Sequence, residues 1–217
     1  MKIVLFGATG NVGQRITKEE DDRSHQMIAV VRDAKASTSP DPRAMLVSGD
    51  GTDAASIAAG AKGADAVISS SISPRPNARG LAAPSLVTSA HAFIKGLADA
   101  GVKRFVVVGG AGSLEVAPGQ ALVDRSFFPE IYKAEANEAR AALKVYRAEA
   151  GMLDGTCLSP AAEMFPGERT GKYRTTGDGF FTDAASKSRI TFEDYAVALV
   201  DELENPKPVG KRFGVAY

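Results

Sequence analysis

The sequence predicts an α/β fold with a mostly parallel, doubly wound sheet and helices on both faces. Short apolar runs rich in Val and Ile recur along the 217 residues, and each is too short to be a helix. Segments with helical periodicity separate these runs, an alternation typical of parallel sheets. The first run is followed directly by three glycines at the spacing G-x-x-G-x-x-G. We therefore expect a single domain over residues 1–217.

The opening residues, MKIVLFGATGNVG, begin with the short apolar run Ile3–Phe6, as expected of a strand buried on both faces. Gly7 allows a sharp turn, Gly10 allows a ligand to approach the backbone, and Gly13 allows the next helix to pack closely on the sheet. The free N–H groups at the start of that helix would face a pyrophosphate. An ordinary strand–helix turn that uses glycines for geometry alone is the alternative. The context predicts a Rossmann-type dinucleotide site formed by Gly7, Thr9, Gly10, Asn11, Val12 and Gly13.

Composition and charge narrow the function classes. Hydrophobic residues make up 44% of the chain and charged residues 24%, as in ordinary globular proteins. Lys plus Arg and Asp plus Glu both number 26, so we expect neither a nucleic acid nor a membrane as a partner. The single cysteine, Cys157, and the absence of a signal peptide before the first strand indicate a cytoplasmic protein. We expect no metal site, and the sequence leaves a homodimer open.

The junction after the second predicted strand, Met27–Val31, bears on the choice of cofactor. In dinucleotide folds a carboxylate here binds the ribose 2′-hydroxyl of NAD, whereas an arginine accommodates the 2′-phosphate of NADP. Arg32 comes first and Asp33 second, so we expect NADP, with NAD as the alternative. Arg32 could also be a plain surface residue. Asp50, after the third strand at Ala44–Ser48, lies where adenine contacts arise, although a turn or helix cap explains it equally well.

The rest of the chain continues the alternation of strands and helices. Further strands are predicted at 66–72, 104–108, 155–158 and 211–215. Helices are predicted at 54–61, 86–100, 131–150 and 192–203. A capping box at Thr191–Asp194 opens the last helix. Residues 114–129 are predicted to be irregular, and the turns and short strands of about 160–190 are predicted to form a small C-terminal substrate region.

Residues at the carboxyl ends of the strands are candidates for a site, because ligands bind there in open α/β sheets. Ser69 and Ser70 end the fourth strand and are expected beside the nicotinamide half of a cofactor. Ser113 follows a glycine turn after the fifth strand and is a candidate for a hydrogen bond to nicotinamide or substrate. Pro160 is expected to shape the pocket floor. Phe127–Pro129 is a candidate apolar wall for a flat ligand.

Two motifs also resemble known families. GATGNVG resembles the glycine motif of the atypical short-chain dehydrogenase/reductases, which include the NmrA-like NAD(P)-binding proteins. The stretches LSPAAEMFPGERTGKYR and EDYAVALVDELE are similar to the group of proteins named NADH-flavin reductases. The resemblance covers essentially the whole chain. It implies a Rossmann fold, a nicotinamide cofactor, and flavin as a substrate rather than a bound prosthetic group.

The chain departs from the wider superfamily at one catalytic motif. Typical members carry Tyr-x-x-x-Lys on the helix after the fifth strand, and the tyrosine supplies a proton. No tyrosine in this sequence has a lysine four residues further on. Lys133 matches the lysine position, but the residue four before it is Pro129, which cannot donate a proton. Ser113 and Lys133 are therefore the candidate catalytic residues.

The missing tyrosine favours one type of reaction. Ketone reduction needs a proton at the developing alkoxide, whereas in flavin reduction the cofactors carry the chemistry and the protein supplies position. We therefore expect an NAD(P)H-dependent oxidoreductase that passes hydride to flavin or a similar flat acceptor such as a quinone. The alternative is a non-catalytic NADP-binding redox sensor of the NmrA type. A sugar-nucleotide epimerase or dehydratase is a third hypothesis, against which the short C-terminal region and the missing motif count.

Overall fold

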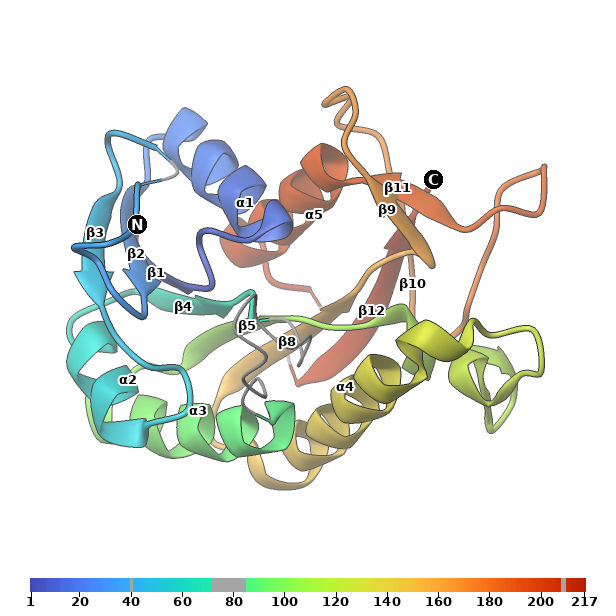
Figure 1. The fold of residues 1–217 in the computed structure, drawn as a ribbon, viewed down its shortest axis with the longest axis horizontal. Helices are drawn as coiled ribbons and strands as arrows, with labels where there is room; N and C mark the ends of the chain where they lie inside the picture. Colours follow the sequence, from blue (N-terminus) through green and yellow to red (C-terminus); the bar gives the residue numbers. More distant parts are fainter. Residues whose placement is uncertain (40, 72–84, 208–209) are drawn as a thin grey trace.

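The computed structural model describes residues 1–39, 41–71, 85–207 and 210–217. A central sheet has the strand order β10-β12-β8-β5-β4-β1-β2-β3 (Figure 1). Its neighbouring strands are parallel except for β10 and β12, so the predicted, mostly parallel sheet is confirmed. The strands span Lys2–Phe6 (β1), Gln26–Val31 (β2), Met45–Ser48 (β3), Ala66–Ser69 (β4), Arg104–Val108 (β5), Asp154–Ser159 (β8), Arg174–Thr176 (β10) and Lys211–Ala216 (β12).

The order of the strands reverses at β1, which pairs with β2 on one side and β4 on the other. In such sheets the crevice for a ligand opens at the carboxyl ends of the strands where the order reverses. The glycine motif follows β1 and therefore lies at this crevice. β4 ends at Ser69, and residue 72, where the sequence predicts its end, lies outside the described residues.

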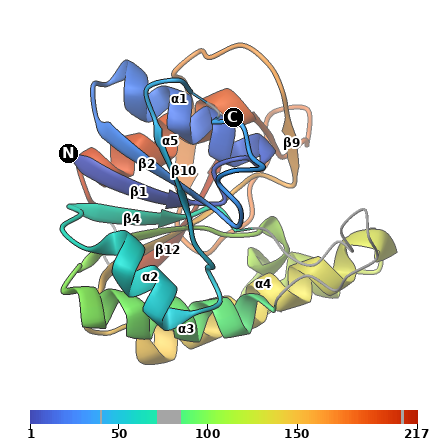
Figure 2. The same ribbon diagram turned by 60° about the vertical axis from the view of Figure 1, so that its left-hand side comes forward.

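Helices cover both faces of the sheet, which confirms the doubly wound arrangement (Figures 1 and 2). On one face lie α1 (Asn11–Asp22) and α5 (Phe192–Glu204), which contact each other. On the other face lie α2 (Ala54–Ala61), α3 (Leu86–Ala100) and α4 (Glu130–Glu149). Each face has its own cluster of buried apolar side chains, because the strands are apolar on both sides.

Local sequence signals set the starts of two helices. The Asp53 carboxylate accepts a hydrogen bond from the backbone N–H of Ala55 at the start of α2. The Thr191 hydroxyl accepts one from the N–H of Asp194 at the start of α5, which confirms that half of the predicted capping box, whereas the N–H of Thr191 donates to the Tyr217 hydroxyl and not to Asp194. Each bond satisfies a backbone donor that the helix leaves unpaired.

Residues 114–129 are more regular than predicted. They contain β6 (Glu115–Ala117) and β7 (Gln120–Ala121), which pair antiparallel, and the 3-10 helix η2 (Leu122–Asp124). Gly119 between the two strands has a φ of 73°, which suits a tight turn. Strands this short carry too little periodicity to be recognised in the sequence.

The predicted C-terminal excursion lies beside α1. Within it, β9 (Glu163–Phe165) and β11 (Arg189–Thr191) pair with each other outside the main sheet. Nε of Arg169, between these strands, donates a hydrogen bond of 2.7 Å to the carboxylate of Glu19 in α1. This ion pair helps to hold the excursion against the helix that follows the glycine motif.

Candidate functional site

The glycine motif turns the chain from β1 into α1, and the packing requires two of its glycines. Gly7 has a φ of 84°, and a β-carbon on it would lie 2.7 Å from the carbonyl oxygen of Ser70. A β-carbon on Gly13 would lie 2.2 Å from the carbonyl oxygen of Gly7. The absence of a side chain at Gly7 lets the loop lie close to the end of β4. The absence of a side chain at Gly13 lets α1 lie close to the loop. The predicted turn at Gly7 and close helix packing at Gly13 are therefore confirmed.

Gly10 differs, because the protein leaves room around it. Its φ of −73° and ψ of 166° suit any residue. The described atom nearest to an added β-carbon would be the carbonyl oxygen of Gly7, 3.5 Å away. Thr9, Gly10 and Asn11 are exposed, and no described side chain caps the start of α1. The free N–H groups of this helix end are thus open to an anionic ligand.

An apolar cavity of about 470 Å³ lies at the carboxyl ends of β5 and β8. Val12 of α1 contributes to its lining, so the cavity adjoins the glycine motif. Pro160, directly after β8, lines it as well, in agreement with the predicted pocket floor. Across from them, Ala136 and Ala139 of α4 complete the wall with small side chains that leave the interior open.

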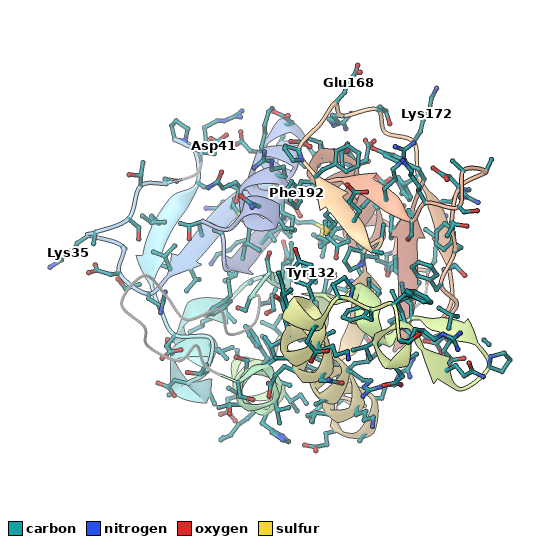
Figure 3. The ribbon with its side chains drawn as sticks, turned by 45° about the vertical axis from the view of Figure 1, so that its right-hand side comes forward. Lys35, Asp41, Tyr132, Glu168, Lys172 and Phe192 are labelled. Carbon is teal, nitrogen blue, oxygen red and sulfur yellow. The ribbon has the colours of Figure 1, made fainter. Side chains whose placement is uncertain are left out.

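Four aromatic side chains belong to the cavity wall. Phe127 and Phe128 lie in the segment that leads into α4, and Tyr132 lies in the first turn of α4 (Figure 3). Phe180 joins them from the excursion. Because Phe127, Phe128 and Pro129 all line the cavity, the predicted apolar wall is confirmed. Aromatic walls favour flat, conjugated ligands.

The serines after β4 lie beside this cavity. Ser71 lines it, and Ser69 lines a smaller chamber of about 30 Å³ that shares Ser71 with the cavity. Ser70 is buried, and its Oγ has no hydrogen-bond partner among the described residues. Contact of Ser69 and Ser70 with a nicotinamide stays a prediction. Cys157 also lines the chamber, where burial raises the pKa of its thiol to about 11 and keeps it neutral.

The two predicted catalytic residues follow lining residues in the chain, and the side chains of both are bonded to other protein groups. The Oγ of Ser113 accepts a hydrogen bond of 3.2 Å from Arg212, and Nζ of Lys133 lies 2.6 Å from a carboxylate oxygen of Glu130. Neither Ser113 nor Lys133 belongs to the cavity lining in the described chain, whereas Tyr132 does. Successive helical residues point about 100° apart, so Lys133 cannot share the direction of Tyr132. The expected place of both residues near a nicotinamide, and their catalytic role, stay predictions.

A family model described as NAD(P)H-binding matches residues 7–206, from the first glycine of the motif to just beyond α5. The chain belongs to this NAD(P)H-binding family. The match agrees with the strand order and the glycine motif, which together make the fold a Rossmann-type α/β fold.

Three solved structures are similar to this NAD(P)H-binding protein over their whole length. A Burkholderia pseudomallei protein named as exported is 43% identical, with a TM-score of 0.88 and 100% of each chain covered. A Bacteroides thetaiotaomicron protein named as an epimerase is 36% identical, with a TM-score of 0.86 and coverage of 100% of this chain and 96% of that one. SP1627 of Streptococcus pneumoniae TIGR4, named as an NADH-flavin reductase, is 32% identical, with a TM-score of 0.86 and coverage of 100% and 99%.

The end of β2 brings Arg32 to the same edge of the sheet as the glycine motif. Phe6 of β1 pairs in register with Val30 of β2, so the residues after both strands lie at the same level. Arg32 is exposed there. The carboxylate of Asp33 instead accepts a hydrogen bond of 3.0 Å from the N–H of Lys35 within its own loop. Contact of Arg32 with a ligand phosphate stays a prediction.

Asp50 has a local role in the described structure. Its carboxylate accepts a hydrogen bond of 2.8 Å from the N–H of Thr52 and one of 2.7 Å from the Thr52 hydroxyl. These bonds agree with the turn that the sequence offered as the alternative for Asp50. Its predicted contact with adenine stays untested.

Among the residues that the structure describes, no helix combines the length and the apolar character that crossing a membrane requires.

Proposed function

We propose that this protein is an NAD(P)H-dependent reductase that passes a hydride to a flat acceptor, either a flavin or a quinone. One observation carries the proposal: the apolar cavity of about 470 Å³, with aromatic side chains in its wall, adjoins the glycine motif. A cavity of this size suits a small-molecule ring system. Its position at the carboxyl ends of the strands is where the reactive half of a dinucleotide and its partner would meet.

The room at Gly10 supports a cofactor pyrophosphate at the glycine motif. A β-carbon there would lie 3.5 Å from the nearest described atom, the carbonyl oxygen of Gly7, so the described chain leaves space in front of the start of α1. The free N–H groups of α1 would bind phosphate oxygens, and bound NAD(P)H would supply the hydride. We propose that the pyrophosphate is held by Gly7, Thr9, Gly10, Asn11, Val12 and Gly13.

The cavity walls would position the acceptor ring and exclude water from it. Apolar side chains exclude water from the space between two reacting rings, and aromatic faces fix the plane of a flat acceptor. Flavin reduction needs no proton donor built into the wall, which suits a site without the Tyr-x-x-x-Lys pair. We propose that Ser69 and Ser70 lie on the nicotinamide side and Pro160 on the floor.

One observation favours a second candidate, an NADP-binding redox sensor without turnover. Tyr132 lines the cavity, and the residue four positions later is Ala136, which cannot lower the pKa of a tyrosine as a lysine would. A site without an activated acid could serve binding alone. The name of the Bacteroides thetaiotaomicron relative favours a third candidate, an epimerase.

The experiment that tests the proposal is a cofactor titration followed by a turnover assay. NADPH and NADH are titrated first, and then riboflavin, FMN or menadione is added while the reduced-nicotinamide absorbance is followed. Saturable consumption is expected. Tight binding without consumption would favour the sensor, and conversion of a sugar nucleotide without net cofactor consumption would favour the epimerase.

Arg32→Ala is expected to weaken NADPH binding about tenfold and to change NADH binding by less than about twofold. A guanidinium–phosphate hydrogen bond contributes roughly 1.5–3 kcal/mol, and only NADPH has the 2′-phosphate. Fluorescence titration of both cofactors measures the two dissociation constants. Arg32→Lys serves as the control and should retain part of the preference. Equal losses for both cofactors would show that Arg32 does not read the phosphate.

Tyr132→Ala is expected to raise KM for riboflavin about tenfold, because it removes one aromatic wall of the cavity. Lys133→Ala is the matched control at the next position, outside the lining, and should change KM by less than about twofold. Steady-state kinetics at saturating NADPH measures both. A larger change of KM in Lys133→Ala than in Tyr132→Ala would mean that Lys133, as the sequence indicates, and not Tyr132 acts at the site.

We also propose that the protein acts in the cytoplasm, where a reductase has access to reduced nicotinamide cofactors. The single cysteine supports this location. Its partner would be the small-molecule acceptor, with no nucleic acid or membrane involved. Cell fractionation with an antibody to the protein tests the location, and recovery outside the cytoplasm would contradict it.

A further inference from the structure

Arg212 is a buried arginine that neither the glycine motif nor the cavity lining uses. It lies on β12, and its side chain is only 1% exposed. Its guanidinium donates to two separate segments of the chain. One is Ser113, whose Oγ and carbonyl oxygen accept at 3.2 and 3.3 Å. The other is Asp178, whose carboxylate accepts from Nε at 2.6 Å and whose carbonyl oxygen accepts from Nη2 at 3.4 Å.

Both segments form walls of the cavity. Ser113 ends the short 3-10 helix η1 (Ala111–Ser113), and Ala111 and Gly112 of that helix line the cavity. Two residues after Asp178 comes Phe180, which lines the cavity from the excursion. Arg212 itself contacts one wall through the end of η1 and the other through Asp178.

Backbone hydrogen bonds continue this link directly between the walls. The carbonyl oxygen of Asp178 accepts from the N–H of Glu115 at 2.8 Å, and the carbonyl oxygen of Glu115 accepts from the N–H of Phe180 at 2.7 Å. Asp178 is thus bonded on its side chain by Arg212 and on its backbone by the segment after η1. Both sets of bonds hold the backbone of the segment that carries Phe180.

The charge state of Asp178 strengthens its bonds to Arg212. Burial alone would raise the pKa of Asp178, but the hydrogen bond and charge of Arg212, together with Arg147, lower it. The Asp178 carboxylate is therefore charged at neutral pH, and charge-assisted bonds to a planar guanidinium are strong and directional. Arg147 also donates to this carboxylate, at 2.5 Å, but its side chain is 48% exposed, and in the described chain this donor bonds to Asp178 without reaching η1.

We propose that Arg212 is a positioning residue that sets the width of the acceptor cavity by holding η1 and Phe180 together. It acts through Ser113 and Asp178 and does not touch the acceptor. The inference rests on the proposed function in one respect, that the cavity takes the acceptor ring. In this proposal Ser113 does not contact the substrate directly. It is the residue at the end of η1 through which Arg212 holds that wall.

Arg212→Met is the test variant, and Arg147→Met is its matched control. The methionine keeps most of the buried apolar volume, and Arg147 still balances the charge of Asp178, so the variant is expected to fold. Hydrogen exchange measures how firmly Arg212 holds the two walls, without any assay of activity. The amides of Glu115 and Phe180 are expected to exchange at least about tenfold faster in Arg212→Met and at the wild-type rate in Arg147→Met.

Kinetics supplies the second readout. Arg212→Met is expected to raise KM for riboflavin about tenfold, with kcat and the NADPH dissociation constant changed by less than about twofold. Arg212→Lys keeps the charge beside Asp178 but lacks the fork that reaches Ser113. It should retain the protection of Phe180 and lose that of Leu114, whose N–H bonds to Ala111 within η1.

Two results would overturn the proposal. One is unchanged exchange at Glu115 and Phe180 in Arg212→Met, and the other is an equal change in Arg147→Met. If Arg212→Met does not fold, the separation of the Phe180 and Leu114 signals in Arg212→Lys decides instead. Absence of turnover with riboflavin, FMN and menadione in the wild-type protein would refute the proposed function, while the exchange data would still decide whether Arg212 holds the two walls.

Discussion

Gly10→Val is expected to abolish NAD(P)H binding and to leave the protein folded. The backbone at Gly10 suits valine, and the described atom nearest to its β-carbon would be 3.5 Å away. The added methyl groups would instead occupy the space in front of the free N–H groups of α1, where the pyrophosphate is proposed to lie. We expect the NADPH dissociation constant to rise by at least about 100-fold, or roughly 2.7 kcal/mol.

Two measurements on the same variant decide this prediction. Fluorescence titration with NADPH gives the affinity, and thermal unfolding gives Tm, which should stay within about 2 °C of the wild-type value. Normal affinity in a folded Gly10→Val protein would mean that the glycines serve only the geometry of the turn.

Gly13→Ala is expected to have the opposite effect, a large loss of stability. The alanine β-carbon would lie 2.2 Å from the carbonyl oxygen of Gly7 and 2.8 Å from Cα of Ala8, both of them backbone atoms. Backbone cannot move aside as a flexible side chain can, so α1 must shift from the sheet. We expect a destabilisation of about 3 kcal/mol, which for a chain of this size lowers Tm by roughly 10 °C.

Gly10→Ala is the matched control for this substitution, because it adds the same methyl group three residues earlier in the motif. It should leave Tm unchanged, and unfolding in urea should give the same separation between the two variants as heating does. A Gly13→Ala protein as stable as wild type would show that the contact between α1 and the turn is not as tight as described.

Much of the fold follows from local features of the sequence. Runs such as Ile3–Phe6 are apolar on both faces because the strands are covered on both sides, so their positions are readable without tertiary information. The caps at Asp53 and Thr191 are equally local, since each side chain bonds to a backbone N–H two or three residues on. The glycine motif is predictable for the same reason: Gly7 and Gly13 contact each other across six residues.

The candidate site was less predictable, because contacts across long stretches of chain place its residues. Ser113 is polar and follows a glycine turn, as residues that contact a substrate often do. Its side chain instead accepts a hydrogen bond from Arg212, which is 99 residues away in the sequence. No local sequence pattern predicts the bond between Arg212 and Ser113. In α4 the buried residues are only Ala136, Ala142 and Leu143, so the helix has a weak apolar stripe. That stripe does not fix which of Tyr132 and Lys133 faces the cavity.

Hydride transfer in the cavity is tested most directly by an anaerobic single turnover with NADPH deuterated at the transferred position of the nicotinamide. Protein saturated with this cofactor is mixed with riboflavin, and the nicotinamide and flavin absorbances are followed together. We expect both absorbances to fall in step and deuterium to slow both equally, since one hydride passes between the two rings. Flavin that stays oxidised beside firmly bound NADPH, with menadione equally unreactive, would contradict this expectation and leave a protein that binds the cofactor without using it.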